Sequence, residues 1–189
     1  MTEKINEICL DKLESIVQIP FGKAAMYMEA CVWCLDQNKH QNGVLLKFSF
    51  NSQAFSYPIS WPEERIDLDK IRNHYNSDDA LPFGAEAIAF FVSINHTEYK
   101  SLKRAVKKTG IDYWLSNESS TQSLPFQNAG RLEISGILKQ SETNTITKRV
   151  KEKIIQTNQS EKTTLPVYVV VVAFDDPCAK MEFKDVTSK

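Results

Sequence analysis

The chain has 189 residues, of which 42% are hydrophobic and 25% charged, enough for one good hydrophobic core and too few for two large domains. Its formal net charge is -1, and no apolar run approaches the roughly 20 residues that span a bilayer, which argues against a membrane protein. The first ten residues lack the basic-then-apolar order of a signal peptide, so a cytoplasmic protein is expected. The four cysteines, including the CxxC at Cys31 and Cys34, form no disulfide framework, and buried thiols are expected.

The first 80 residues predict a helical hairpin followed by a β-hairpin. Apolar residues recur at helical spacing and then alternate with polar ones. Helices are predicted over residues 2–18, 23–38 and 66–75, and strands over 44–50 and 55–61. Pro58 places the second strand at a sheet edge. The aromatic face of this hairpin is typical of packing on helices, although such faces also stack unpaired bases. A loop over 76–82 is the predicted boundary between residues 1–80 and residues 81–189.

The second part of the chain predicts a mixed sheet. Its apolar segments change between helical and strand spacing along the chain. Helices are predicted over residues 83–94 and 143–158, and strands over 99–106, 111–115, 131–138, 167–174 and 178–183. The strand over 167–174 is almost wholly apolar, which is typical of a central strand covered on both faces. The fold class is therefore α/β (α+β), with a mixed central sheet flanked by helices.

Two of the predicted buried strands each carry a single acid, Asp112 and Glu133. An unpaired carboxylate in a low-dielectric core is costly, and a divalent cation would neutralise the pair. Carboxylate oxygens are the ligands that Mg²⁺ prefers. Asp112 could instead cap a turn or pair with Arg104 or Arg131.

The order of these segments resembles a known family. It runs from a helix with Gly84-Ala85-Glu86-Ala87, through Gly110-Ile111-Asp112-Tyr113 and Leu132-Glu133-Ile134-Ser135, to a basic helix and a hydrophobic strand. Over about residues 81–183 this resembles the core of the PD-(D/E)XK nuclease superfamily, a restriction-endonuclease-like fold. The resemblance implies that Asp112, Glu133, the backbone carbonyl of Ile134 and Glu86 hold Mg²⁺, or Mn²⁺ in its place. Glu86 is equally typical of an ordinary first-turn helix acid.

The chain departs from the family pattern at two positions. Ile111-Asp112 replaces the usual proline-aspartate pair, and Ser135 stands where the family most often has lysine. A lysine from the following helix could take that place. The candidates are Lys148, Lys151 and Lys153, of which Lys148 and Lys151 share one side of the helix and are preferred as catalytic residues. Gln156 resembles a helix glutamine of some branches of the superfamily.

Positive charge is concentrated in the second part of the chain. Residues 97–162 hold 12 Lys and Arg against 7 Asp and Glu, a local +5, which leaves -6 for the rest. Such a region could face nucleic acid, although a charge run is usually a solvated face. The residues proposed to contact nucleic acid are Lys107, Lys108, Arg131, Lys148, Arg149 and Lys153.

The sequence thus predicts a Mg²⁺-dependent endonuclease or nuclease subunit acting on DNA, within a prokaryotic restriction or phage-defence system. A homodimer is one expectation, because cutting two strands with one active site per chain is most simply done by two chains. A protein partner, an ATPase or specificity subunit, is the other, because the sequence contains no phosphate-binding P-loop. A second hypothesis is a catalytically inactive DNA-binding or assembly subunit. A third is a protein-interaction module that uses the N-terminal hairpins.

Overall fold

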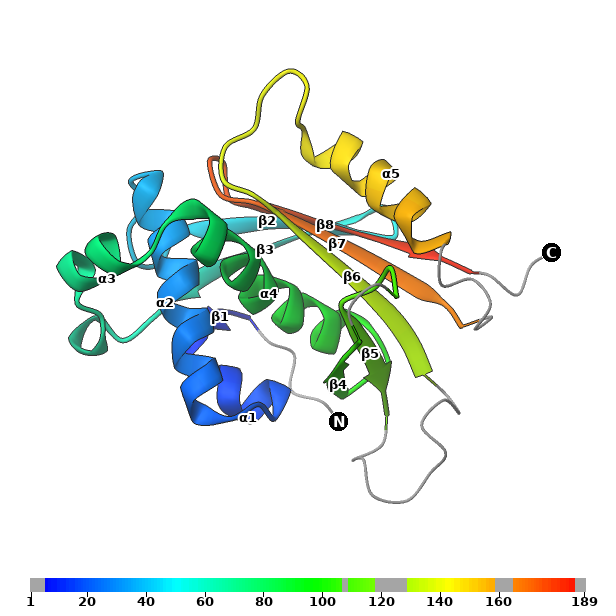
Figure 1. The fold of residues 1–189 in the computed structure, drawn as a ribbon, viewed down its shortest axis with the longest axis horizontal. Coiled ribbons are helices and arrows are strands. Elements are labelled where there is room, and N and C mark those ends of the chain that lie inside the picture. The colour runs from blue at the N-terminus through cyan, green and yellow to red at the C-terminus, as the bar shows by residue number, and fades with distance from the viewer. Residues whose placement is uncertain (1–5, 107–108, 118–128, 159–164, 186–189) are drawn as a thin grey trace.

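The computed structural model describes residues 6–106, 109–117, 129–158 and 165–185, and in it helices flank both faces of one curled sheet (Figure 1). The strands are β1 (Ile8–Cys9), β2 (Leu45–Phe50), β3 (Gln53–Ser60), β4 (Ser101–Arg104), β5 (Tyr113–Ser116), β6 (Ala129–Ile137), β7 (Val167–Ala173) and β8 (Cys178–Lys184). Their order across the sheet is β1-β3-β2-β8-β7-β6-β5-β4. The predicted mixed sheet flanked by helices is confirmed.

The helices are distributed unevenly over the two faces. They are α1 (Leu13–Val17), α2 (Phe21–Gln37), α3 (Leu68–His74), α4 (Ser77–His96) and α5 (Ile146–Gln156), with short 3₁₀ turns at Leu10–Lys12 and Glu63–Arg65. Among the helices that the structure describes, α5 is the only one on its face of the sheet, whereas α2 and α4 pack together on the other face (Figure 1). The larger hydrophobic core therefore lies under α2 and α4, and a smaller one lies under α5. None of the helices in the described ranges combines the length and apolar character that crossing a membrane requires.

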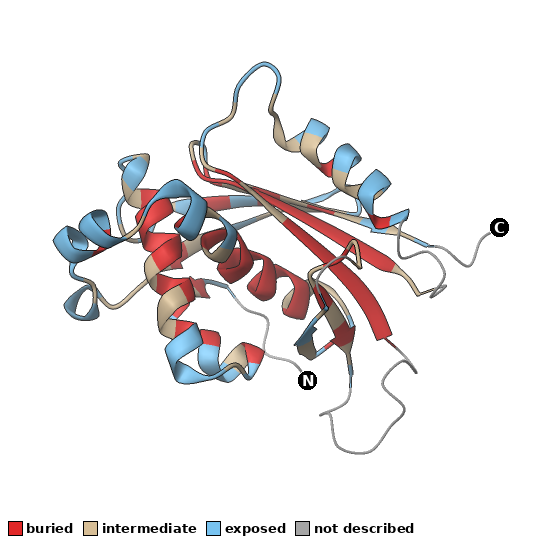
Figure 2. Cartoon of the chain, viewed as in Figure 1, coloured by how far each residue is buried: buried red, intermediate tan, exposed pale blue. Residues whose placement is uncertain are grey.

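The part of the sheet that carries the two strand acids runs β4-β5-β6 as an antiparallel meander. Helix α5 then returns the chain so that β7 pairs parallel with β6. Every residue of β7 is buried, as Figure 2 shows, which confirms the predicted central strand covered on both faces.

The first 80 residues extend this sheet. Strand β2 pairs parallel with β8, and it continues through β3 to the short β1. The loop predicted over 76–82 is wrong, because α4 begins at Ser77 and the Asn76 side chain caps it by accepting hydrogen bonds from two backbone N–H groups. The predicted division at residue 80 thus falls inside α4, and one sheet contains strands from both sides of it.

The helix predicted over 2–18 is shorter than expected. Residues 1–5 lie outside the described ranges, Ile8 and Cys9 pair with Ile59 and Ser60 as β1, and α1 begins only at Leu13. Strand β1 covers β3 at those two positions only, so Pro58 lies where the outer side of β3 has no neighbouring strand in the described chain.

The aromatic face of the β-hairpin packs against the end of α4. Phe48 is 1% exposed, and the His96 ring lies 4.7 Å from the Phe48 ring and 4.4 Å from the Phe55 ring. The hydroxyl of Tyr57 lies 2.8 Å from Nε2 of His96. The predicted packing on a helix is confirmed, and it leaves little of this face open for stacking bases.

Close packing of α2 on α4 depends on Gly84. A Cβ atom there would lie 3.0 Å from the backbone oxygen of Ala30 and 3.1 Å from the Cys34 sulfur. We expect Gly84→Val to lower the free energy of unfolding by about 1–3 kcal/mol, because backbone atoms of α2 cannot move aside cheaply. Gly22→Val is the control, since a Cβ at Gly22 meets nothing within 4 Å. Urea denaturation of both variants measures the difference, and equal stabilities would contradict the prediction.

Candidate functional site: two opposed carboxylates beneath helix α5

The antiparallel pairing of β5 with β6 brings Asp112 and Glu133 together. Tyr113 pairs with Leu132, so the preceding Asp112 comes opposite Glu133. The Asp112 backbone N–H donates to the Leu132 carbonyl at 2.9 Å, and Oδ2 of Asp112 accepts from the Ile134 N–H at 2.8 Å. Although 20 residues lie between them in the sequence, Asp112 and Glu133 are therefore neighbours in the structure. The backbone groups of Leu132 and Ile134, on either side of Glu133, fix the position of Asp112.

Helix α5 supplies the partners of Glu133. Leu132 and Ile134 belong to the core under α2 and α4, so Glu133 between them faces α5. Lys153 Nζ donates to Oε1 of Glu133 at 2.7 Å, and Gln156 Nε2 donates to the same oxygen at 3.1 Å. Lys153 also donates to Gln156 Oε1 at 3.0 Å. A lysine from the helix thus stands beside the strand acids, as expected from the presence of serine at position 135.

The identity of that lysine differs from the preferred choice. Lys148 and Lys151 share a side of α5, but both are exposed, and Lys153 makes the contact. Val150 is buried against the sheet, and Lys153, three residues later, lies on the same side of the helix. The spacing of Lys153 from the buried apolar residues of α5 was therefore the sequence signal that could have identified it as the lysine facing the sheet.

Burial and charge shift the ionisation of Glu133. Glu133 is buried, with 2% of its surface exposed. Desolvation, and next the nearby charge of Asp112, raise the pKa of Glu133 from its ordinary 4.5 to about 7, although Lys153 acts in the opposite direction. Two carboxylates this close favour a bound cation or a proton between them.

This shift makes stability depend on pH. In the unfolded chain Glu133 ionises near 4.5, whereas in the folded chain it ionises near 7, so the folded state binds more protons between these values. Without metal, the wild type should lose on the order of 2–3 kcal/mol relative to Glu133→Gln as pH rises from 4.5 to 8. Urea denaturation in EDTA at pH 5 and pH 8 measures it. Glu142→Gln, at an exposed acid, is the control and should follow the wild type.

Glu86 lies on the other face of the sheet and takes part in a separate cluster. Its Oε1 accepts from Arg104 Nη1 at 2.6 Å, and its Oε2 accepts from the Tyr113 hydroxyl at 2.8 Å. The Tyr113 hydroxyl lies 3.1 Å from that of Tyr27. Desolvation raises the pKa of Glu86, and the charge of Arg104 opposes that shift. The predicted role of Glu86 as a metal-supporting acid therefore has no support from its contacts, and it is not a first-turn helix acid either.

The proposed nucleic-acid contacts fall into different environments. Arg131 is fully buried, and its guanidinium donates to the carbonyls of Leu165 and Thr157, so it braces the end of α5 instead of facing a ligand. Arg149 is partly buried and donates to Asn144. Lys148 remains exposed. Lys107 and Lys108 lie outside the described residues.

The donor set fits a magnesium ion only in part. No group of three or more His, Cys, Asp or Glu suited to a metal occurs in the described ranges. However, within the same ranges no N–H or ammonium group hydrogen-bonds Oδ1 of Asp112 or Oε2 of Glu133. Mg²⁺ is commonly held by one or two carboxylates, with water and substrate phosphates as its remaining ligands. Asp112, Glu133 and the Ile134 carbonyl are therefore chemically suitable, without Glu86.

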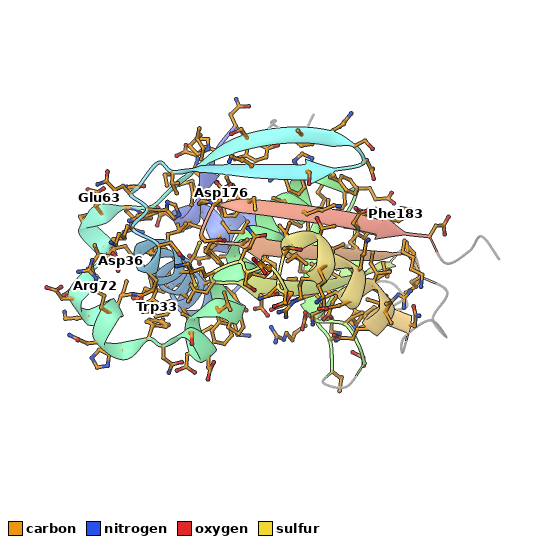
Figure 3. All side chains as sticks on the ribbon, turned by 90° about the horizontal axis from the view of Figure 1, so that it is seen from above. Trp33, Asp36, Glu63, Arg72, Asp176 and Phe183 are labelled. Atoms are coloured by element: carbon orange, nitrogen blue, oxygen red, sulfur yellow. The ribbon has the colours of Figure 1, made fainter. Side chains whose placement is uncertain are left out.

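A groove of about 700 Å³ lies elsewhere, between the end of α2, the segment that follows β3, and α3. Figure 3 labels Asp36, Arg72 and Glu63 around it; Arg72 donates to both oxygens of Asp36, at 2.7 and 2.8 Å. The charges of Asp36 and Arg72 thus pair with each other, and the two opposed acids beneath α5 remain the stronger candidate.

Comparisons of the chain with protein-family models, with curated proteins and with solved structures find no match.

Proposed function

We propose that the chain is a Mg²⁺-dependent nuclease or nuclease subunit that hydrolyses DNA phosphodiester bonds, with Asp112 and Glu133 as metal ligands and Lys153 beside the attacking water. The observation that carries this proposal is the pair of opposed acids with a lysine of α5 at 2.7 Å from one of them. Clustered ionisable groups with shifted pKa values are typical of active sites, although ion-pair networks produce them as well.

The order of elements supports a restriction-endonuclease-like core. Helix α4 is followed by the β4-β5-β6 meander, by the crossover helix α5 and by β7 parallel to β6. Asp112 directly precedes the second strand of this unit, and Glu133 lies within the third. This is the arrangement that the sequence resemblance implies.

Each residue has a separate task in this proposal. The Ile134 N–H holds one oxygen of Asp112 and leaves the other available as a ligand. Gln156 holds Glu133 from the helix side, and the Lys153 ammonium stabilises negative charge that develops on water and phosphate. When bound, Mg²⁺ lowers the pKa of a coordinated water and polarises the phosphate.

The test is incubation of supercoiled and linear DNA with the wild-type protein in Mg²⁺, in Mn²⁺ and in EDTA. Cleavage in either metal that EDTA abolishes is expected. A well-folded protein that is inert in both metals, alone and with the products of neighbouring genes, would overturn the catalytic proposal. A homodimer, an ATPase or specificity subunit as partner, and a restriction or phage-defence system remain parts of the proposal. Repeating the cleavage assays with the products of neighbouring genes added tests the partner and the system.

A second candidate is an inactive DNA-binding or assembly subunit. The ion pair between Lys153 and Glu133, together with serine at position 135, favours it, because a site that has lost its metal must neutralise its acids from within. Calorimetric titration with Mg²⁺ and Mn²⁺ separates the candidates. The nuclease should bind metal and lose that binding on Glu133→Gln, whereas the inactive subunit should bind DNA without binding metal.

A further inference from the structure

Trp114 lies on the same face of the sheet as the two strand acids. Its neighbours on β5, Tyr113 and Leu115, belong to the core under α2 and α4. Side chains alternate between the faces along a strand, so Trp114 points to the face of α5, as Asp112 does two residues earlier, at a Cα separation of roughly 7 Å. Helix α5 packs on β6, β7 and β8, and β4 and β5 continue this face of the sheet beyond the helix (Figure 1).

The indole of Trp114 is part of neither hydrophobic core. Within the described ranges, the cluster under α2 and α4 and the smaller one under α5 are both built without it. Trp114 is partly exposed, whereas Tyr113 and Leu115 on either side of it are buried. Tryptophan is on average a highly buried residue, because its large ring stabilises a fold by leaving water. A partly exposed indole beside two acids therefore calls for a role other than core packing.

Positive charge flanks Trp114 on both neighbouring strands. Lys103 of β4 and Arg131 of β6 are its directly opposite partners, and such pairs have Cβ atoms roughly 4.5–5.5 Å apart. Lys103 is exposed, and it follows Leu102, which packs on the core, so its side chain points to the Trp114 face. Arg131 is buried and held by the carbonyl of Leu165. An aromatic ring with an exposed cation beside it suits a base and a backbone phosphate.

We propose that Trp114 stacks an unpaired base of the DNA strand that is cut at Asp112 and Glu133, and that Lys103 binds a phosphate of the same strand. The inference rests on the proposed function and names its substrate class: single-stranded or locally unpaired DNA. A base inside a duplex is stacked on its neighbours, so an indole can stack only on a base that has left the duplex. A ring that only stabilises the sheet would affect binding of single strands and duplexes alike.

The test compares the affinity for a labelled single-stranded oligonucleotide with that for its duplex, by fluorescence anisotropy in EDTA, which separates binding from cleavage. The wild type should bind the single strand more tightly. Trp114→Leu should weaken binding of the single strand by about 5–100-fold, the range for loss of one stacked base, and leave the affinity for the duplex unchanged. Trp114→Phe keeps an aromatic ring and should retain most of the affinity for the single strand.

The salt dependence of the same binding separates the part of Lys103 from that of Trp114. Lys103→Gln should lower the slope of log affinity against log salt for the single strand by about 0.7, as the loss of one phosphate contact predicts. Trp114→Leu should leave that slope unchanged, because stacking releases no counterion. Lys70→Gln makes the same charge change on α3 at a side chain 79% exposed and is the control, which should alter neither the affinity nor the slope appreciably.

Indole emission gives a readout that does not depend on how well Trp114→Leu folds. A base stacked on Trp114 should quench the emission of the wild type, whereas Trp114→Phe, which retains the buried Trp33 and the distant Trp61, should show no quenching. Absence of quenching in the wild type, or Trp114 variants that bind single strands as the wild type does, would overturn this inference alone, provided that the wild type still binds and cuts DNA. A wild type that binds neither form of DNA at about 50 mM salt would overturn the proposed function together with it.

Discussion

Asp112→Asn and Glu133→Gln are each expected to lower the rate of metal-dependent DNA cleavage by on the order of 10³-fold or more. Each replaces a proposed metal ligand by a neutral group of the same shape, and the stabilisation that a metal gives to the transition state amounts to several kcal/mol. The measurement is the cleavage rate in Mg²⁺ at pH 8 under single-turnover conditions. A rate near that of the wild type in either variant would remove the metal site from the proposal.

These two substitutions preserve the local hydrogen bonds. An amide oxygen at position 112 still accepts from the Ile134 N–H, and one at position 133 still accepts from Lys153 and Gln156. Removing one of two neighbouring like charges should leave stability at pH 8 unchanged or raised. Asp176→Asn, at an exposed acid of the β7–β8 turn, is the control for loss of a carboxylate. Its cleavage rate should equal that of the wild type, so a loss confined to Asp112 and Glu133 would reflect chemistry and not unfolding.

The elements that follow from local patterns were predictable. Strand β7 consists of apolar residues throughout, and its complete burial follows from that composition. Asp112 and Glu133 stood out because each is a single acid in an apolar strand, and antiparallel pairing of consecutive strands is common enough to expect them side by side. The sequence did not indicate the register between β5 and β6, and in the structure Asp112 lies opposite Glu133.

The contacts that the sequence did not indicate depend on distant partners. Glu86 pairs with Arg104 of another element, and nothing in the apolar pattern of α4 names that arginine. Arg131 was proposed as a nucleic-acid contact because it lies in the basic part of the chain, but it is buried and donates to the backbone carbonyls of Leu165 and Thr157, which have no sequence signature. The parallel pairing of β2 with β8 likewise joins segments some 130 residues apart, so the continuity of the sheet across residue 80 could not be deduced from local spacing.

Lys153→Met is expected to lower the cleavage rate by about 10²–10⁴-fold with little change in DNA affinity. The variant keeps the aliphatic part of a side chain that is 20% exposed and removes the ammonium group that lies 2.7 Å from Glu133. A group that assists proton transfer or stabilises charge at the attacked phosphate contributes about this much. Lys151→Met, on the exposed side of the same helix, is the matched control and should retain full activity.

Rescue separates a chemical role of Lys153 from a structural one. Ser135 lies two residues after Glu133 on β6, so its side chain points to the same face of the sheet. Adding Ser135→Lys to the Lys153→Met variant should restore part of the cleavage rate, because an ammonium group then reaches the acids from the strand instead of the helix. If Lys153 only holds α5 on the sheet, the added lysine should leave the rate low, and the inactive DNA-binding subunit would become the better account of the Glu133–Lys153 ion pair.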